Sequence, residues 1–157
     1  MNKIVMVAGI PGSGKSTWIK QQIRKSNKEC VHISRDEVRF SILKDGDEYF
    51  AKEKEVFRTF IHKIQKEIDS GDLKTIYIDA THLNRKSRSK VLNRLNLGDT
   101  IVEMVWFDVP LKVCIARNSL RTGRERVPEE TIADMFFSLE EPTEDEAKII
   151  KFVKNGW

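Results

Sequence analysis

The chain has 157 residues and a formal net charge of +4, with 39% hydrophobic and 33% charged residues. No apolar run approaches the roughly 20 residues that a membrane-spanning helix needs, which excludes a membrane protein. The frequent apolar clusters and the small net charge exclude an intrinsically disordered chain. The length fits one domain, which is expected to span residues 1–157.

The charge is unevenly distributed along the chain. Residues 84–126 contain 10 basic and 4 acidic residues, whereas residues 127–146 contain 8 acidic residues and no basic ones. The basic segment favours an anionic substrate. The acidic segment is expected either to cover a solvated face away from that substrate or to dock on the basic helix.

The first half of the chain predicts two strands and three helices. The continuous apolar run at 4–8 predicts a strand buried on both faces of a parallel sheet. A Gly-rich turn follows, and residues 16–24 have helical composition. A strand is then predicted at 31–34 and a short helix at 36–43. A longer helix is predicted at 49–69, with an apolar stripe at Phe50, Phe57, Ile61, Ile64 and Ile68.

The second half continues this alternation. Residues 75–79 predict a third buried strand that ends in a carboxylate, and residues 85–95 predict a basic helix. The remaining predictions are a strand at 101–109, helices at 111–120 and from residue 128, and a last strand at 148–153. Alternating strands and helices indicate an α/β domain with a mainly parallel sheet of four to five strands flanked by helices.

Residues 9–17, with the sequence GIPGSGKST, match the phosphate-binding motif GxxxxGK[ST] without a gap. They follow a predicted strand and open a predicted helix, which is the context that this motif requires. The motif predicts a P-loop that binds ATP with Mg²⁺, in which Lys15 reaches the β- and γ-phosphates and the Ser16 hydroxyl binds the metal. The predicted ATP-binding residues of the loop are Gly9, Pro11, Gly12, Ser13, Gly14, Lys15, Ser16 and Thr17.

Carboxylates follow the second and third predicted strands, at the edge where α/β sheets bind ligands. Asp36 is a candidate acceptor of a hydroxyl proton, with Arg39 on the same helix face. A helix cap at Asp36 and a surface charge at Arg39 fit the spacing equally well. Asp79 is a candidate Walker-B-like carboxylate for Mg²⁺, or a turn residue. Thr81 is a candidate acceptor contact, and His82 is a structural residue or a contact at the edge of the substrate.

Four arginines surround a Thr-Gly pair near the end of the basic segment. Guanidinium groups bind phosphate in a fork geometry that lysine lacks, and the glycine gives flexibility. The cluster predicts a lid at about 117–128 that closes on a triphosphate, with a solvated helix end as the alternative. Its members are Arg117, Arg121, Arg124 and Arg126.

With these motifs, the chain resembles the kinase domain of the phage polynucleotide kinase–phosphatase enzymes over roughly residues 1–139. The segments that carry the resemblance are GIPGSGKSTW, ISRDEVRFSI, DATHLN, WFDVP and RNSLRTGRERVPEE, in the family order. The resemblance implies a P-loop kinase fold and transfer of the γ-phosphate of ATP to the 5′-hydroxyl of DNA or RNA. It also implies a phage origin and a role in nucleic-acid repair.

The resemblance implies a role for each matching residue. Lys15 and Ser16 would hold the β-phosphate and the metal, and Asp36 would be the general base that activates the 5′-hydroxyl. Arg39 would orient the acceptor. Thr81 would lie beside the acceptor nucleotide, where the family often has Asn in place of the following His82. Arg121 would be the lid arginine on the transferred phosphate, with Arg117 nearby.

Two other classes of function remain open. A small-molecule P-loop kinase acting on a nucleoside, nucleotide or sugar has the same loop and lid, and an NTP-binding module without transfer activity is the third hypothesis. No phosphatase domain is expected within 157 residues. The two cysteines lack ligand spacing and no secretory signal precedes the first strand, so a cytoplasmic protein is expected. The sequence does not decide between a monomer and a homo-oligomer.

Overall fold

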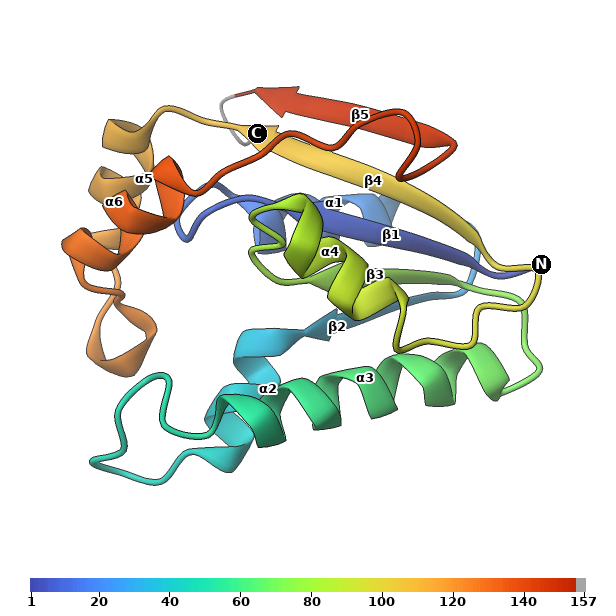
Figure 1. The fold of residues 1–157 in the computed structure, drawn as a ribbon, viewed down its shortest axis with the longest axis horizontal. Coiled ribbons are helices and arrows are strands. Elements are labelled where there is room, and N and C mark those ends of the chain that lie inside the picture. Colours follow the sequence, from blue (N-terminus) through green and yellow to red (C-terminus); the bar gives the residue numbers. More distant parts are fainter. Residues whose placement is uncertain (155–157) are drawn as a thin grey trace.

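The computed structural model describes residues 1–154, which form a five-stranded sheet in the order β2-β3-β1-β4-β5 (Figure 1). Every pair of neighbouring strands is parallel. The predicted α/β class, with a mainly parallel sheet of four to five strands, is therefore confirmed. The strands are β1 (Lys3–Ala8), β2 (Cys30–Ser34), β3 (Thr75–Asp79), β4 (Ile101–Asp108) and β5 (Ile149–Lys154).

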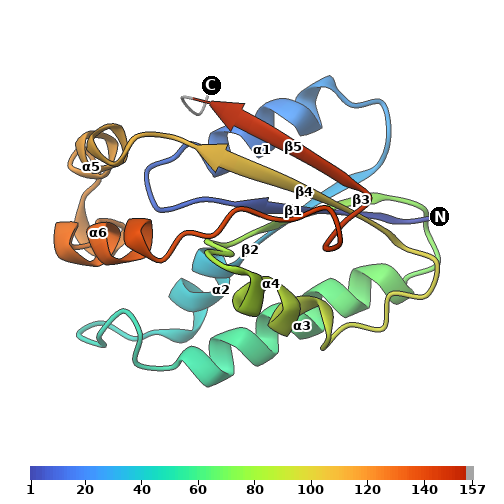
Figure 2. The ribbon, with the colours of Figure 1, turned by 45° about the horizontal axis from the view of Figure 1, so that its top comes forward.

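Helices cover both faces of the sheet. Helices α3 and α4 lie on one face, and α1 lies on the opposite face (Figure 2). Within residues 1–154, no helix has the length and apolarity needed to cross a membrane. The helices are α1 (Lys15–Lys25), α2 (Arg35–Ile42), α3 (Glu53–Asp69), α4 (Arg85–Leu92), α5 (Leu111–Asn118), the 3-10 turn η1 (Gly123–Glu125) and α6 (Glu129–Phe137).

The central strand β1 supplies side chains to a hydrophobic core on each side of the sheet. Ile4 and Met6 pack with the residues of α3 and α4, whereas Val5 and Val7 pack with those of α1, α5 and α6. Successive side chains of a strand point to opposite faces, so a strand covered on both sides must be apolar throughout. This explains the continuous apolar run at 4–8.

The predicted helix at 49–69 begins later than its apolar spacing indicated. Residues 49–52 form turns, and α3 starts at Glu53, with Glu53 and Glu55 in its first turn beside the positive end of the helix dipole. Phe50 is therefore not part of the buried stripe, and it is 49% exposed. Its spacing of seven residues from Phe57 is helical only by coincidence.

The acidic segment, residues 127–146, docks on helix α4. This is the second of the two expectations for that segment. Arg88 is fully buried, and its guanidinium donates to the Glu146 carboxylate at 2.8 and 3.1 Å. It also donates to the backbone oxygens of Glu140 at 2.8 Å and His82 at 3.1 Å. Arg85 pairs with the Asp145 carboxylate at the surface. These bonds fix the chain between α6 and β5 against α4.

Replacing the buried Arg88 should strongly destabilise the fold. Arg88→Ala leaves the Glu146 carboxylate buried without its counter-charge, and such a loss costs about 3–5 kcal/mol. We expect the free energy of unfolding in urea to fall by this amount. The matched control is Lys86→Ala on the exposed side of the same helix, which should change stability by less than about 0.5 kcal/mol. Equal effects of the two variants would contradict this account.

Candidate active site

The loop between β1 and α1 has the backbone that phosphate binding requires. Gly12 and Gly14 have φ values of +84° and +97°, where side chains are strained. A Cβ at Gly12 would also lie 2.3 Å from the backbone oxygen of Cys114. Helix α1 begins at Lys15 without a side-chain cap on its first amides. Those amides and the helix dipole therefore suit an anion such as a phosphate.

The Lys15 ammonium lies inside this loop. Its Nζ donates to the backbone oxygens of Gly9 at 2.7 Å and Ile10 at 3.3 Å. Burial lowers the pKa of Lys15, and the nearby carboxylates of Asp79 and Asp36 oppose that shift. The Lys15 amine thus lies close to the place where phosphates would bind.

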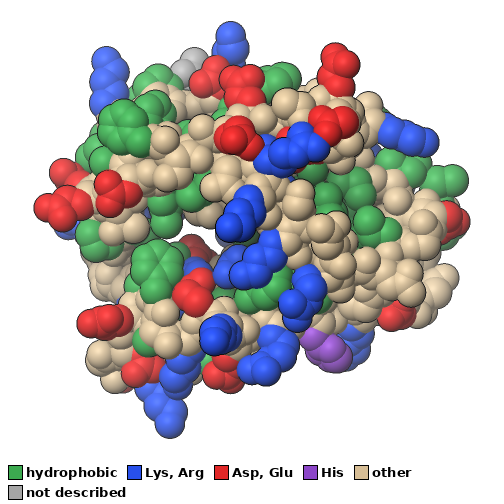
Figure 3. Space-filling view, viewed as in Figure 1, with side chains coloured by type: hydrophobic (Ala, Val, Ile, Leu, Met, Phe, Trp, Pro, Cys, Tyr) green, Lys and Arg blue, Asp and Glu red, His purple; other side chains and the backbone are tan. Residues whose placement is uncertain are grey.

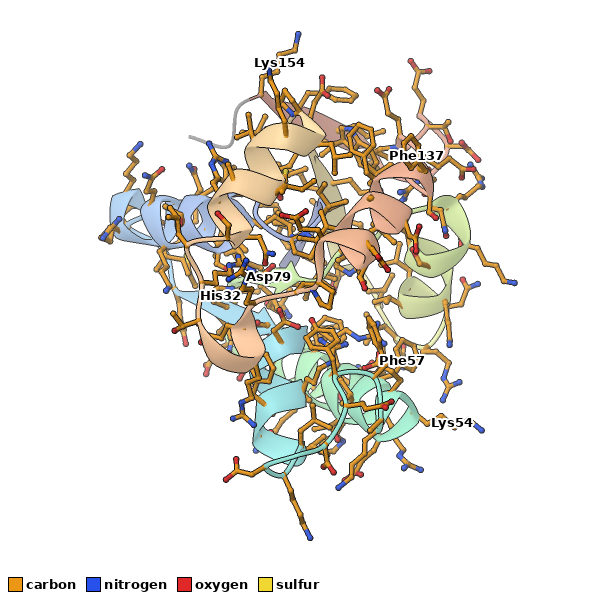
Figure 4. The ribbon with its side chains drawn as sticks, turned by 90° about the vertical axis from the view of Figure 1, so that its left-hand side faces the viewer. His32, Lys54, Phe57, Asp79, Phe137 and Lys154 are labelled. Carbon is orange, nitrogen blue, oxygen red and sulfur yellow. The ribbon has the colours of Figure 1, made fainter. Side chains whose placement is uncertain are left out.

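A buried carboxylate joins the loop to the sheet. Asp79 ends β3 and is 5% exposed. Its Oδ2 accepts a hydrogen bond from the Ser16 hydroxyl at 2.7 Å and lies 2.9 Å from Nε2 of His32 (Figure 4). Burial alone would raise the pKa of Asp79. The bonds from His32 and Ser16 and the charge of Lys15 outweigh burial and lower the pKa, so the carboxylate stays ionised.

The chemistry of Ser16 and Asp79 fits Mg²⁺. A hydroxyl and a carboxylate are the hard oxygen donors that this ion prefers. Residues 1–154 contain no group of three His, Cys, Asp or Glu side chains placed to hold a metal. Phosphate and water oxygens would therefore complete the coordination, as is usual for Mg²⁺ bound with a nucleotide.

Asp36 presents its carboxylate to the site. The cap of α2 is Ser34, whose hydroxyl accepts from the backbone N–H of Glu37 at 3.2 Å. The alternative that Asp36 caps the helix is therefore wrong. The Asp36 side chain is 47% exposed and accepts hydrogen bonds from Arg39 and from the Tyr49 hydroxyl. Two donors on one oxygen leave the other oxygen open to a ligand.

Arg39 is held rigidly beside Asp36. Its side chain is 5% exposed, so the alternative of a surface charge is also wrong. The guanidinium donates from Nε to the Glu53 carboxylate at 2.9 Å and from Nη2 at 3.1 Å. It also lies 4.2 Å from the centre of the Tyr49 ring. Such a two-bond contact fixes the plane of the guanidinium.

The sequence analysis missed Tyr49 and Glu53. Tyr49 lies in the turns between α2 and α3, Glu53 is the first residue of α3, and neither belongs to a motif. The only signal was Glu53 in the first turn of a helix, which also fits a surface residue. Burial is the main cause, and the Asp36 charge the second, of a pKa for the Tyr49 hydroxyl far above its ordinary value. The hydroxyl therefore keeps its proton and remains a hydrogen-bond donor.

These groups line one cleft of about 350 Å³. Figure 3 shows a hollow between the part of the molecule that carries α5 and α6 and the part that carries α2 and α3. The cleft brings together the residues of the predicted phosphate and acceptor sites. Its lining includes Pro11, Gly12, Gly14, Lys15, Ser16, Thr17, Asp36, Arg39, Tyr49, Phe50, Glu53, Asp79, Thr81, Arg121 and Met135.

The four arginines of the predicted lid divide into two groups. Arg121 lines the cleft, and Arg117 donates to the P-loop oxygens of Gly12 at 3.4 Å and Ser13 at 3.3 Å. Arg124 instead lies 4.8 Å from the centre of the Phe40 ring and donates to the backbone oxygen of that residue at 3.1 Å. Arg124 and Arg126 both line a separate pocket beside Phe40, not the cleft.

His82 does not reach the cleft, so the predicted substrate contact is wrong and the structural alternative holds. Its side chain is 3% exposed, and its φ is +44°. The chain turns inward after β3, and Nδ1–H donates to the backbone oxygen of Val7 at 2.7 Å. Nε2 is buried without a hydrogen-bond partner in residues 1–154. Thr81, the residue before it, does line the cleft.

The buried His82 should make stability depend on pH. Burial lowers its pKa from 6.5 to about 4. Between these values the unfolded chain binds more protons than the folded one, so stability is lost as the pH falls. From pH 6.5 to pH 4, His82 should remove about 3 kcal/mol of unfolding free energy.

His82→Asn tests this contribution, because Asn tolerates a positive φ. Urea unfolding of both proteins across pH 4–8 gives the difference between their pH dependences. The curve of the variant should be flatter by about the predicted amount. Parallel curves would show that His82 does not titrate as its burial requires.

A family model described as an AAA domain matches residues 4–142. The chain belongs to this AAA domain family. A curated relative, "Transcription factor bHLH140" of Arabidopsis thaliana, is 30% identical over 123 residues, which are 78% of this chain. The chain spans only 12% of the length of that protein.

Among the solved structures with a similar fold are an RNA repair complex and a sugar kinase. The Pnkp1/Rnl/Hen1 RNA repair complex contains a chain with a TM-score of 0.71 at 20% identity, over 88% of this chain and 44% of that one. A sugar kinase from Janibacter sp. HTCC2649 gives a TM-score of 0.68 at 20% identity, over 99% of this chain and 86% of that one. The comparisons confirm the predicted P-loop kinase-like fold.

Proposed function

We propose that this protein is a polynucleotide 5′-hydroxyl kinase, which transfers the γ-phosphate of ATP to the 5′-hydroxyl of DNA or RNA with Mg²⁺. The observation that carries the proposal is the placement of Asp36 and Arg39 in the same cleft as the P-loop. The Asp36 carboxylate is near enough to Lys15 for its charge to raise the pKa of that lysine. A phosphate donor and a hydroxyl acceptor can therefore meet between them.

Each residue then has a role that fits its surroundings. The P-loop amides and Lys15 hold the phosphates of ATP, and Ser16 with Asp79 holds the metal, which supplies positive charge against the phosphate oxygens. Asp36 accepts the proton of the 5′-hydroxyl while that oxygen bonds to the γ-phosphorus and ADP leaves. Arg121 neutralises charge on the group in transfer. The reaction needs positioning and charge more than covalent catalysis, which matches this set of residues.

The acceptor side of the cleft supports a nucleotide end as the acceptor. Arg39, fixed by Glu53, holds the Asp36 carboxylate in place toward the acceptor. Phe50 is 49% exposed and lines the cleft, so its ring offers a stacking surface for a base. The segments ISRDEVRFSI and DATHLN, which carry the resemblance to polynucleotide kinases, supply Asp36, Arg39 and Thr81.

A small-molecule kinase is the second candidate, because the fold is equally similar to that of a sugar kinase. The test is transfer of radiolabel from ATP to acceptors with a free hydroxyl, with Mg²⁺ or with EDTA. A 12-nucleotide DNA and RNA with 5′-hydroxyl ends should be labelled, and the same oligonucleotides with 5′-phosphates should not. Labelling of a nucleoside or sugar at equal or higher kcat/KM would favour the second candidate. ATP binding without labelling of any acceptor would favour a non-catalytic module.

Asp36→Asn should lower kcat by about 10²-fold or more, because the amide cannot accept the proton. The affinity for ATP should stay within about 2-fold, since Asp36 serves the acceptor. The measurements are steady-state kinetics with the 12-nucleotide acceptor and calorimetric titration with ATP. The matched control is Glu37→Gln, an exposed acid one residue away that does not line the cleft. Equal losses in kcat and ATP affinity would contradict the role of Asp36 as base.

A further inference from the structure

A basic groove lies between α3 and α4, beside the cleft. It has a volume of about 330 Å³ and is lined by Arg35, Glu53, Lys54, Phe57, Arg58, Lys90 and Arg94. Figure 3 shows Lys and Arg side chains gathered across this face, over α3 and α4 and next to the hollow. Five of the seven lining residues are cations, and only one is an acid.

Most of this positive charge is uncompensated. Lys54, Arg58, Lys90 and Arg94 are exposed, and none of them has an ion pair within 4.0 Å in the described part of the chain. Arg85 and Arg88, on the same helix α4, are paired with the acidic segment. The segment therefore neutralises one side of α4 and leaves the other side open to an anion.

The buried Phe57 ring positions the cations of the groove. Lys90 Nζ lies 4.7 Å from the ring centre, and the guanidinium carbons of Arg35 and Arg94 lie at 5.4 and 5.8 Å. Such contacts attract cations to the ring face. Phe57 itself is only 8% exposed, so it offers no surface for stacking a base. The groove thus suits the phosphates of a backbone and not its bases.

The groove and the cleft adjoin, because the paired side chains of Arg35 and Glu53 line both. We infer that the groove binds the sugar–phosphate backbone of a single-stranded acceptor, with the nucleotides 3′ of the phosphorylated end lying along α3 and α4. This inference rests on the proposed function and adds a subsite to it. It requires that the protein prefer oligonucleotides over mononucleotides and that the preference be independent of sequence.

The test compares acceptors of 2 and 12 nucleotides, as DNA and as RNA, with the double variant Lys90→Gln/Arg94→Gln. The KM for the 12-nucleotide acceptor should rise at least about 10-fold, and the loss should be smaller for the dinucleotide, which is too short to follow the groove. Removing two phosphate contacts should reduce the slope of log Kd against log salt by about 1.4, measured by anisotropy with 3′-fluorescein oligonucleotides without ATP.

The matched control is Arg24→Gln/Lys25→Gln, which removes the same two charges from the exposed end of α1 on the opposite face of the sheet. Its KM for the 12-nucleotide acceptor should change less than 2-fold. If the α4 variant melts at a lower temperature than the native protein, Lys54→Gln/Arg58→Gln on α3 provides the same test.

The outcomes separate the groove from the proposed function. One result would be transfer to oligonucleotides that does not depend on their length, with the same KM for the groove variants and the native protein. It would overturn backbone binding in the groove and leave the proposed kinase function unaffected. A different result would be no transfer to any oligonucleotide, together with a higher Kd for oligonucleotides in the groove variants and not in the control variant. It would support backbone binding in the groove and overturn the proposed kinase function. If the groove variants and the control variant weaken oligonucleotide binding equally, the effect is one of general charge, and backbone binding in the groove is overturned.

Discussion

The buried carboxylate of Asp79 connects the three chain segments on which the site depends. It ends β3, accepts the Ser16 hydroxyl from α1 and lies within hydrogen-bond distance of His32 on β2. In the parallel register, Asp79 lies opposite Val7 of β1 and Ser34 of β2. The P-loop and the start of α2 therefore leave the two strands that flank β3 at the same level. This register, fixed by apolar strands that are buried on both faces, places Lys15 and Asp36 in one cleft.

The acceptor side depends on a second set of contacts, centred on Glu53. Its carboxylate binds Arg39 through two nitrogens and Arg35 through a third. Because Glu53 is the first residue of α3, the position of that helix sets the position of the Arg39 guanidinium and, through it, of the Asp36 carboxylate. A strong charge pair on a rigid helix gives more precise placement than a pair on a loop.

Local sequence patterns were sufficient for the strands, most helices and the P-loop, because each depends on residues close together in the chain. Glu53, Tyr49 and His32 were missed, since their importance arises from contacts made across 13 to 47 residues of sequence. His82 was ambiguous for a related reason. Its place next to Thr81 gave two possible roles, and only the inward turn of the backbone at φ +44° decides between them. Polar residues that follow a strand can face the cleft or the core, and the sequence does not distinguish these directions.

The uneven charge of the chain acquires a structural meaning on α4. The acidic segment carries enough carboxylates to neutralise the whole helix. Within residues 1–154, however, it pairs only with Arg85 and Arg88 of α4, near the amino-terminal half of that helix. Lys90 and Arg94 stand around Phe57 on the side that faces α3. Exposed cations held close together repel one another, so this arrangement costs stability unless an anion occupies the groove. The partial neutralisation of α4 therefore favours binding of an extended polyanion that starts at the cleft.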